Sequence, residues 1–263
     1  AAIAAGAPEN CVQWITQPSM EATTALMNHE GIATILATGG NAMVKAAYSC
    51  GKPALGVGAG NVPAYVEKSA NIRQAAHDIV MSKSFDNGMV CASEQAVIID
   101  KEIYDEFVEE FKSYHTYFVN KKEKALLEEF CFGAKANSKN CAGAKLNPNI
   151  VGKSAVWIAE QAGFTVPEDT NILAAECKEV GEKEPLTREK LSPVIAVLKS
   201  EDTEDGLKKA RQMVEFNGLG HSAAIHTKDE TLAKRFGTEI KAMRIIWNSP
   251  STFGGIGDVY NAF

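Results

Sequence analysis

The most informative absence in this sequence of 263 residues is that of any long apolar run. Polar residues interrupt each hydrophobic stretch before it reaches the roughly 20 residues that a membrane-spanning helix needs. The start, AAIAAGAPEN, contains no Lys or Arg and so lacks the charged region that opens a secretory signal peptide. The sequence therefore predicts a protein without a membrane partner, and we expect it in the cytoplasm.

Concentrated positive charge is absent as well. Lys and Arg number 27 against 33 Asp and Glu, which leaves a formal net charge of -6 at pH 7. The KKEK sequence at 121–124 is followed by two glutamates at 128–129, so it predicts a solvated helix face. A groove for nucleic acid needs basic residues clustered on one face, and we expect no nucleic-acid partner.

Closely spaced cysteines are also missing. The six cysteines form no CxxC pair and lie at Cys11, Cys50, Cys91, Cys131, Cys141 and Cys177. Disulfide frameworks are typical of short secreted chains, and structural zinc sites need ligands in close pairs. The sequence therefore predicts reduced thiols and no metal site, with Cys11, Cys50 and Cys177 as small buried residues.

What the sequence does contain is an alternation of helical and strand patterns, which is typical of an α/β protein with a parallel sheet. Hydrophobic periodicity predicts helices over 18–30, 71–85, 102–115, 152–163, 203–216 and 229–240. Short apolar runs predict strands over 32–38, 53–60, 96–100, 192–200, 221–227 and 244–249. Between 120 and 150 the pattern weakens, and only a charged helix and a loop are expected.

A possible anion site occurs in ILATGGNAMVKAA at 35–47, where a strand, two glycines and a helix follow one another. Glycine lets the backbone approach a ligand, and a helix N-terminus offers unpaired N–H groups and the positive end of its dipole. Thr38, Gly39 and Gly40 are therefore candidates for contact with a phosphate, although a plain strand-to-helix connection has the same pattern. The nearby GVGAGN at 56–61 lacks the third glycine of the dinucleotide fingerprint.

Cys91 is the candidate nucleophile. In SKSFDNGMVCASEQ, at 82–95, it follows a predicted turn at Asp86–Gly88 and precedes a predicted buried strand. A reactive thiolate needs an exposed, polar setting with N–H donors, and a loop of this kind can supply one. The alternative is that Cys91 is a buried structural thiol.

Two further polar residues stand beside predicted strands. His221, in NGLGHSAAIHT, follows glycines at the mouth of a strand, where it could exchange a proton or only cap the strand end. Glu189, in REKLSPVIAVLK, precedes a buried strand, where its carboxylate could hold a ribose hydroxyl or serve no special role. Three other histidines, His29, His77 and His115, are predicted to lie on the surface.

Taken in order, these segments resemble the aldehyde dehydrogenase superfamily over nearly the whole chain. They are HEGIATILATGGNAMVKAA, GVGAGNVPAYVEKSANI, the Cys91 loop, EKLSPVIAVLK, GLGHSAAIHTKD and RIIWNSPSTFGGIG. MSKSFDNGMVCASEQAVII is most similar to the CoA-acylating acetaldehyde dehydrogenase domain of bifunctional alcohol/acetaldehyde dehydrogenases. The resemblance implies part of a Rossmann-like cofactor domain in residues 1–60 and an α/β catalytic domain in 61–263. Cys91 is then expected to face the cleft between them, at a carboxyl-end crevice of the sheet.

The resemblance also implies a reaction. Acetaldehyde, coenzyme A and NAD+ would interconvert with acetyl-CoA and NADH through a thioester on Cys91, and His221 matches a histidine near the acyl-transfer site. The expected partners are thus a small aldehyde and a CoA thioester, and the expected assembly is a homo-oligomer. The residues that match cofactor-binding positions are Thr38, Gly39 and Gly40 for the pyrophosphate of NAD and Glu189 for its nicotinamide ribose.

One difference from the hydrolytic members of the family bears on the acyl acceptor. Those members carry a glutamate in the segment that matches 56–60, whereas this segment is GVGAG, without a carboxylate. A thiol of low pKa needs less help from a general base than water does, so CoA is the expected acceptor.

The resemblance leaves alternatives for the function of the chain. Family domains begin before the point that matches Ala1 and continue beyond residue 263, so we expect the central part of a longer enzyme. One alternative is a stand-alone acylating dehydrogenase for a longer aldehyde such as propionaldehyde. Another is a non-catalytic piece that binds nucleotide or assembles with copies of itself.

Overall fold

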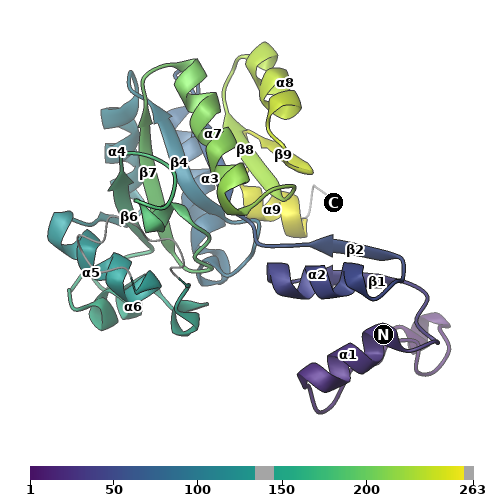
Figure 1. Ribbon diagram of the computed structural model, residues 1–263. Helices are drawn as coiled ribbons and strands as arrows, with labels where there is room; N and C mark the ends of the chain where they lie inside the picture. The colour runs from purple at the N-terminus through teal and green to yellow at the C-terminus, as the bar shows by residue number, and fades with distance from the viewer. Residues whose placement is uncertain (134–144, 258–263) are drawn as a thin grey trace. The chain divides into compact units, whose positions relative to one another are not determined.

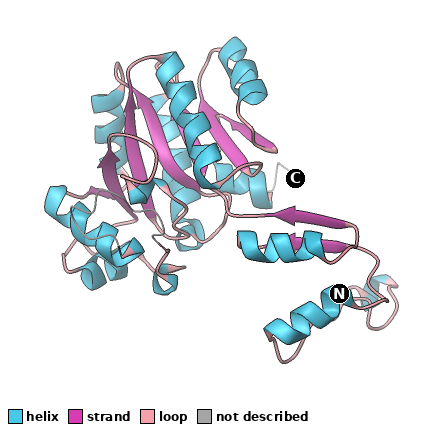
Figure 2. Ribbon diagram, in the orientation of Figure 1, coloured by secondary structure: helices cyan, strands magenta, loops and turns pink. Residues whose placement is uncertain are grey.

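The computed structural model describes residues 1–133 and 145–257, and the chain divides into two compact units, Ala1–Gly58 and Ala59–Phe263. Helices and strands alternate along both units (Figure 1, Figure 2). The α/β class predicted from the sequence is confirmed. Within the described ranges, no helix combines the length and the apolarity that crossing a bilayer requires.

The first unit contains two parallel strands and two α-helices. Strand β1 (Ile35–Thr38) pairs with β2 (Ala54–Val57) along its whole length, and helix α2 (Asn41–Ser49) connects them. Helix α1 (Met20–Asn28) begins after Ser19, whose hydroxyl accepts a hydrogen bond from the Ala22 N–H at 3.0 Å. This bond satisfies one of the unpaired donors of the first turn, so Ser19 is the N-cap of α1.

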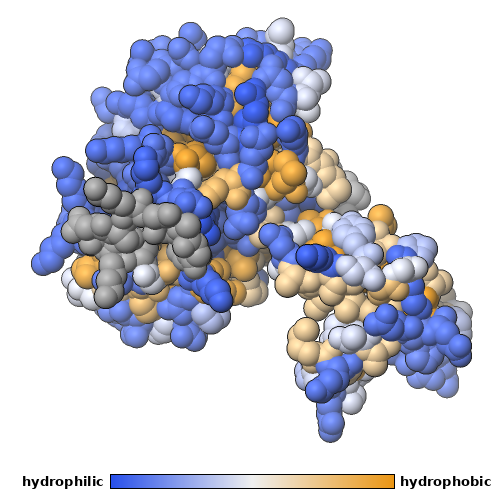
Figure 3. Space-filling model, in the orientation of Figure 1, coloured by the Kyte–Doolittle hydropathy of each residue, from blue (hydrophilic) through white to orange (hydrophobic). Residues whose placement is uncertain are grey.

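Little of the first unit is buried. Among its residues, all of which the structure describes, only Ala37 and Ala47 belong to the buried apolar set. Trp14, Leu36 and Val12 are at least 74% exposed, and apolar colours appear on the surface of this unit in Figure 3. A two-stranded sheet with so little buried area has scarcely any core of its own.

The second unit is built on a sheet of seven described strands in the order β5-β6-β7-β4-β3-β8-β9. Each neighbouring pair in this sheet is parallel. The strands are β3 (Val62–Val66), β4 (Glu94–Asp100), β5 (Thr116–Phe118), β6 (Ile172–Cys177), β7 (Val194–Ser200), β8 (Ser222–His226) and β9 (Arg244–Trp247).

Helices cover both faces of this sheet. Helices α3 (Ile72–Ser84) and α4 (Tyr104–Ser113) contribute to the hydrophobic cluster on one face. The cluster on the other face draws on α5 (Lys121–Phe132), α6 (Ala155–Ala162), α7 (Thr203–Asn217) and α8 (Glu230–Glu239). The remaining short helices are α9 (Ser251–Ile256) and the 3-10 helices η1 (Ile3–Ala5), η2 (Phe85–Gly88), η3 (Pro148–Ile150) and η4 (Pro185–Thr187).

Strand β4 shows how the two layers divide the core. Ala96 and Ile98 belong to one hydrophobic cluster, while Val97 and Ile99 belong to the other. Successive side chains of a strand point to opposite faces, and a strand between two helical layers has no solvent face. This arrangement explains why every residue of β4 is buried, as its apolar run predicts.

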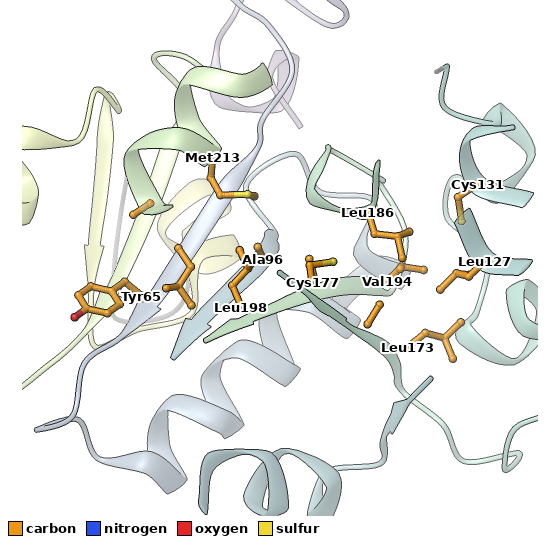
Figure 4. Packing of buried hydrophobic residues seen from close by; sticks show 14 of the residues in the cluster. Tyr65, Ala96, Leu127, Cys131, Leu173, Cys177, Leu186, Val194, Leu198 and Met213 are labelled. Atoms are coloured by element: carbon orange, nitrogen blue, oxygen red, sulfur yellow. The ribbon is translucent and has the colours of Figure 1, made fainter. Parts of the chain in front are cut away.

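The larger cluster joins elements that are far apart in the sequence. Figure 4 shows Ala96, Leu198 and Met213 of this cluster, from β4, β7 and α7. Cys131 and Cys177 lie in the same cluster and are buried, as predicted for Cys177. The burial predicted for Cys11 is wrong and that of Cys50 is only partial, because both belong to the unit that has almost no core.

A buried histidine at the end of β8 makes the stability of the second unit depend on pH. His226 is 2% exposed, and burial lowers its pKa to about 4. Its Nε2 has no hydrogen-bond partner among the described residues. In an unfolded chain the pKa of histidine is about 6.5, so between these two values the unfolded state binds more protons. The free energy of unfolding should therefore decrease as the pH falls from about 6.5 to about 4, by about 3 kcal/mol from this group.

Urea denaturation over this pH range measures the effect. The variant His226→Leu has a neutral side chain at every pH. Its free energy of unfolding should therefore fall less on acidification, by the amount that His226 contributes. An acid dependence as steep in the variant as in the unmodified chain would show that His226 is not the group responsible.

Candidate active site

The candidate site is formed where loops meet the amino-terminal ends of five neighbouring strands. Glu189 precedes β7, Cys91 precedes β4, Gly60 precedes β3, His221 precedes β8, and Arg244 is the first residue of β9. These strands lie next to one another in the order β7-β4-β3-β8-β9. In this sheet Cys91 is therefore at the amino ends, and the expected carboxyl-end position is wrong, because the cysteine comes before its strand and not after it.

The turn before Cys91 shapes the loop that presents the thiol. Asp86, Asn87 and Gly88 have φ values of 50°, 49° and 67°, which confirms the predicted turn. Asp, Asn and Gly are the residues that tolerate this left-handed region best. After the turn, Cys91 is exposed while Ala92 is buried. The cysteine is thus accessible to solvent just before the chain enters the core.

Gly60 brings three of the predicted site residues together. Its N–H donates a hydrogen bond to Oε1 of Glu189 at 2.7 Å. A Cβ on Gly60 would lie 2.3 Å from the carbonyl oxygen of Cys91 and 3.1 Å from Nδ1 and Cε1 of His221. No side chain fits in that space, so the close approach of these three loops requires glycine.

This contact also places a carboxyl group beside the segment 56–60, where the sequence alone shows none. The segment 56–60 has no carboxylate of its own, but the carboxylate of Glu189 is hydrogen-bonded to its last residue, Gly60. Burial raises the pKa of Glu189 above its ordinary value. A carboxyl group is thus present beside Gly60, supplied by a loop 129 residues away in the sequence.

A hydrogen-bond chain leads from Arg244 to His221. Nη1 of Arg244 donates to Oγ of Ser222 at 3.3 Å, and this Oγ lies 3.1 Å from Nδ1 of His221. Because the serine oxygen accepts from the guanidinium, its own proton is free to bond Nδ1, which favours the imidazole tautomer with hydrogen on Nε2. Burial and then the charge of Arg244 lower the pKa of His221, so its ring is neutral near pH 7.

Charges of opposite sign act on the thiol of Cys91. Although the residue is exposed, its neighbours partly shield the thiol from water, and this shielding and the carboxylate of Glu189 raise its pKa. The positive charge of Arg244 and the backbone N–H groups of Cys91 and Ala92 act in the opposite direction. Arg244 is a site residue that sequence reasoning missed, because nothing in the strand pattern RIIWNS marks it.

These two charges predict opposite effects of substitution on Cys91. Glu189→Gln removes a negative charge, so the pKa of the thiol should decrease and its alkylation at a fixed pH should become faster. Arg244→Gln removes a positive charge, so the pKa should increase and alkylation should become slower. The rate of iodoacetamide modification at Cys91, followed against pH by peptide mass mapping, measures both.

A carboxylate outside the site provides the control for this experiment. Glu201→Gln removes one negative charge after the carboxyl end of β7, at the opposite edge of the sheet, and should leave the profile of Cys91 unchanged. Shifts of the same sign in the Glu189 and Arg244 variants would contradict the assignment of the two charges.

Two buried lysines hold the loops of Cys91 and Glu189 against β4. Nζ of Lys83 donates to Oε1 of Gln95 at 3.2 Å, and Nζ of Lys190 donates to the backbone carbonyl of the same Gln95 at 3.0 Å. Burial lowers the pKa of both amines, that of Lys190 to about 7. Since Lys190 follows Glu189 directly, this contact ties the chain next to Glu189 to β4.

The remaining predicted residues lie in the first unit. Thr38 ends β1, Gly39 has φ 153°, and Gly40 precedes α2 without a side-chain cap. All three are exposed, and a Cβ on Gly40 would meet nothing within 4 Å. The start of α2 thus has open space at Gly40, and contact of these three residues with a phosphate stays a prediction.

Comparison with known proteins gives the family of the chain. The profile of the aldehyde dehydrogenase family matches residues 1–258. An aldehyde-alcohol dehydrogenase of Streptococcus pneumoniae is 91% identical over 263 residues, which is 100% of this chain and 30% of that protein. The chain thus spans 30% of the length of this curated relative.

Solved structures lead to the same family. The acetylating aldehyde dehydrogenase of Geobacillus thermoglucosidasius superposes with a TM-score of 0.89 at 44% identity, over 98% of this chain and 55% of that one. The propionaldehyde dehydrogenase of Rhodopseudomonas palustris, solved with bound CoA and an acylated cysteine, gives 0.84 at 31% identity, over 99% of this chain and 57% of that one. The chain belongs to the aldehyde dehydrogenase family.

Proposed function

We propose that this chain is the thiol-bearing part of an NAD-dependent, CoA-acylating aldehyde dehydrogenase that interconverts acetaldehyde and acetyl-CoA. The observation that carries the proposal is the convergence of Cys91, Glu189 and His221 on Gly60. The names of its relatives, an aldehyde-alcohol dehydrogenase and an acetylating aldehyde dehydrogenase, support the reaction type.

Acyl transfer is the step proposed for the residues of this chain. The sulfur of Cys91, after loss of its proton, attacks the carbonyl carbon of acetyl-CoA, and the bond between that carbon and the CoA sulfur breaks. An acetyl thioester is left on Cys91, and the proton ends on the thiol of CoA. His221, neutral near pH 7, is proposed to carry this proton between the two sulfur atoms. The reverse step uses the same groups.

The residues present fit a nicotinamide cofactor. When bound, NAD+ would accept the hydride that leaves the aldehyde. In the first unit, Thr38, Gly39 and Gly40 are proposed to hold the pyrophosphate at the uncapped start of α2. In the second unit, Glu189 is proposed to accept a hydrogen bond from a ribose hydroxyl. Within the described residues, Oε1 accepts the hydrogen bond of the Gly60 N–H, and Oε2 is proposed for this role.

Incubation of the chain with acetyl-CoA, followed by intact mass and peptide mapping, tests the proposal. We expect one acetyl group, on Cys91, which added CoA removes faster than buffer alone. Cys11 is the internal control because it is an exposed thiol in the other unit, and it should stay unmodified. Acetyl groups on both thiols, or on neither, would show that residue 91 is not a specific acyl acceptor.

A further inference from the structure

A cavity of about 810 Å³ lies at the edge of the sheet opposite to Cys91. Its lining includes Asn120, shortly after the end of β5, Lys178, directly after β6, and Lys199, near the end of β7. The cavity is therefore at the carboxyl ends of these three strands. Its volume is within the range of about 300–1,000 Å³ that is usual for small-molecule sites.

The topology of the sheet places this cavity where open parallel sheets bind ligands. Strand β4 is followed by α4, which packs on one face, and its neighbour β7 is followed by α7, which packs on the other. Neighbouring strands whose connections leave in opposite directions open a crevice at their carboxyl ends. Tyr104 of α4 and Lys209 of α7 both line the cavity, so it occupies this crevice.

Positive charge dominates the lining. Five lysines and three glutamates line the cavity, a formal excess of two positive charges in a chain whose net charge is -6. The glutamates already have partners. Glu184 pairs with Lys124, Glu201 pairs with Lys101 at 3.3 Å, and Glu176 accepts a hydrogen bond from the hydroxyl of Tyr104 at 3.0 Å.

Three of the lining lysines have ammonium groups that no described carboxylate neutralises. In the part of the chain that the structure describes, Lys121, Lys178 and Lys199 form no ion pair with a carboxylate. The ammonium group of Lys199 lies 4.4 Å from the centre of the Tyr104 ring. Such groups at one cavity can bind an anion that carries several negative charges, and lysine is a common phosphate ligand.

We propose that this cavity binds a small phosphate-bearing anion, with Lys121, Lys178 and Lys199 in contact with its phosphate oxygens. The binding involves neither Cys91 nor any residue given a role in acyl transfer. It therefore goes beyond the proposed function, and acyl transfer could fail without affecting it.

Calorimetric titration of the full chain with inorganic pyrophosphate, at low ionic strength, tests this proposal. We expect one saturable site, and at least about tenfold weaker binding in the double variant Lys121→Gln/Lys178→Gln. ADP is titrated in parallel. Tighter binding of ADP than of pyrophosphate would identify a nucleotide as the natural type of ligand, and the reverse would identify a free anion.

A matched control separates the cavity from the charge of the whole surface. Lys68 and Lys228 are exposed, follow β3 and β8 at the same edge of the sheet, and form no ion pair among the described residues. Neither lines the cavity. The double variant Lys68→Gln/Lys228→Gln should therefore bind pyrophosphate within about twofold of the unmodified chain.

Chemical footprinting gives a second measurement that needs no substitution. Pyrophosphate should protect Lys121, Lys178 and Lys199 from acetylation by a small reagent and leave Lys68 and Lys228 reactive. Absence of saturable binding, equal weakening by the two double variants, or equal protection of all five lysines would overturn the proposal.

Discussion

Replacing Cys91 by alanine is expected to abolish the transfer of an acetyl group from acetyl-CoA to the chain, with a decrease in rate of about 10⁴-fold or more. In the proposed reaction the acetyl group is held on sulfur, and no other described thiol of the second unit can take over. Cys131 and Cys177 are buried in the core, and burial raises the pKa of each to about 12. A thiol in that state is neither ionised nor accessible.

The stability of this variant separates loss of chemistry from loss of structure. Because Cys91 is exposed, Cys91→Ala should change the free energy of unfolding by no more than about 0.5 kcal/mol. Cys11→Ala, which removes an exposed thiol from the first unit, should leave acetyl transfer at its original rate. An alanine variant at position 91 that still accepts acetyl groups at the original rate would rule out Cys91 as the nucleophile.

The second large effect is expected from Gly60→Ala. The added Cβ would lie 2.3 Å from the carbonyl oxygen of Cys91, so the loop of Cys91 has to move. Overpacking of this kind costs about 1–3 kcal/mol of stability. A displacement of about 1 Å in a catalytic group can reduce its rate about 10²-fold, and we expect a decrease of this order in the acetylation of Cys91.

Gly237 provides the matched control for this substitution. It lies in α8, and a Cβ there would meet nothing within 4 Å. Gly237→Ala should stabilise the chain by about 0.5–1 kcal/mol, because alanine favours a helix over glycine, and acetylation should not change. Urea denaturation and the rate of acetyl transfer measure both effects. If Gly60→Ala behaved like Gly237→Ala, the close approach at Gly60 would have no importance for the site.

Helices were the part of the fold most open to prediction, because each one carries its own periodicity and its own end signals. The pattern at 203–216 corresponds to α7, which spans Thr203–Asn217 and is capped by Asp202. The pattern at 71–85 corresponds to α3, which spans Ile72–Ser84. Each of these signals lies within one segment, so no knowledge of distant contacts is needed to interpret it.

Three strands could not be predicted in this way. Strand β3 contains Pro63, which has no N–H to donate and argues against a central strand. In the structure the pairing of β3 with β4 shifts register between Val62 and Pro63, and this irregularity accommodates the proline. Strand β5 is only Thr116–Phe118, and β6 is rich in alanine. Both depend on neighbouring strands more than on their own propensity.

The sequence by itself determined the α/β class and the chemical types available for a site, a thiol at Cys91, a carboxyl group at Glu189 and an imidazole at His221. Only the tertiary structure decided that these groups converge on Gly60 and that Arg244 acts on two of them. The physical reason is that the strands of the sheet do not lie in sequence order. Which loops meet at its edge depends on how distant strands pair, and local periodicity carries no information about that pairing.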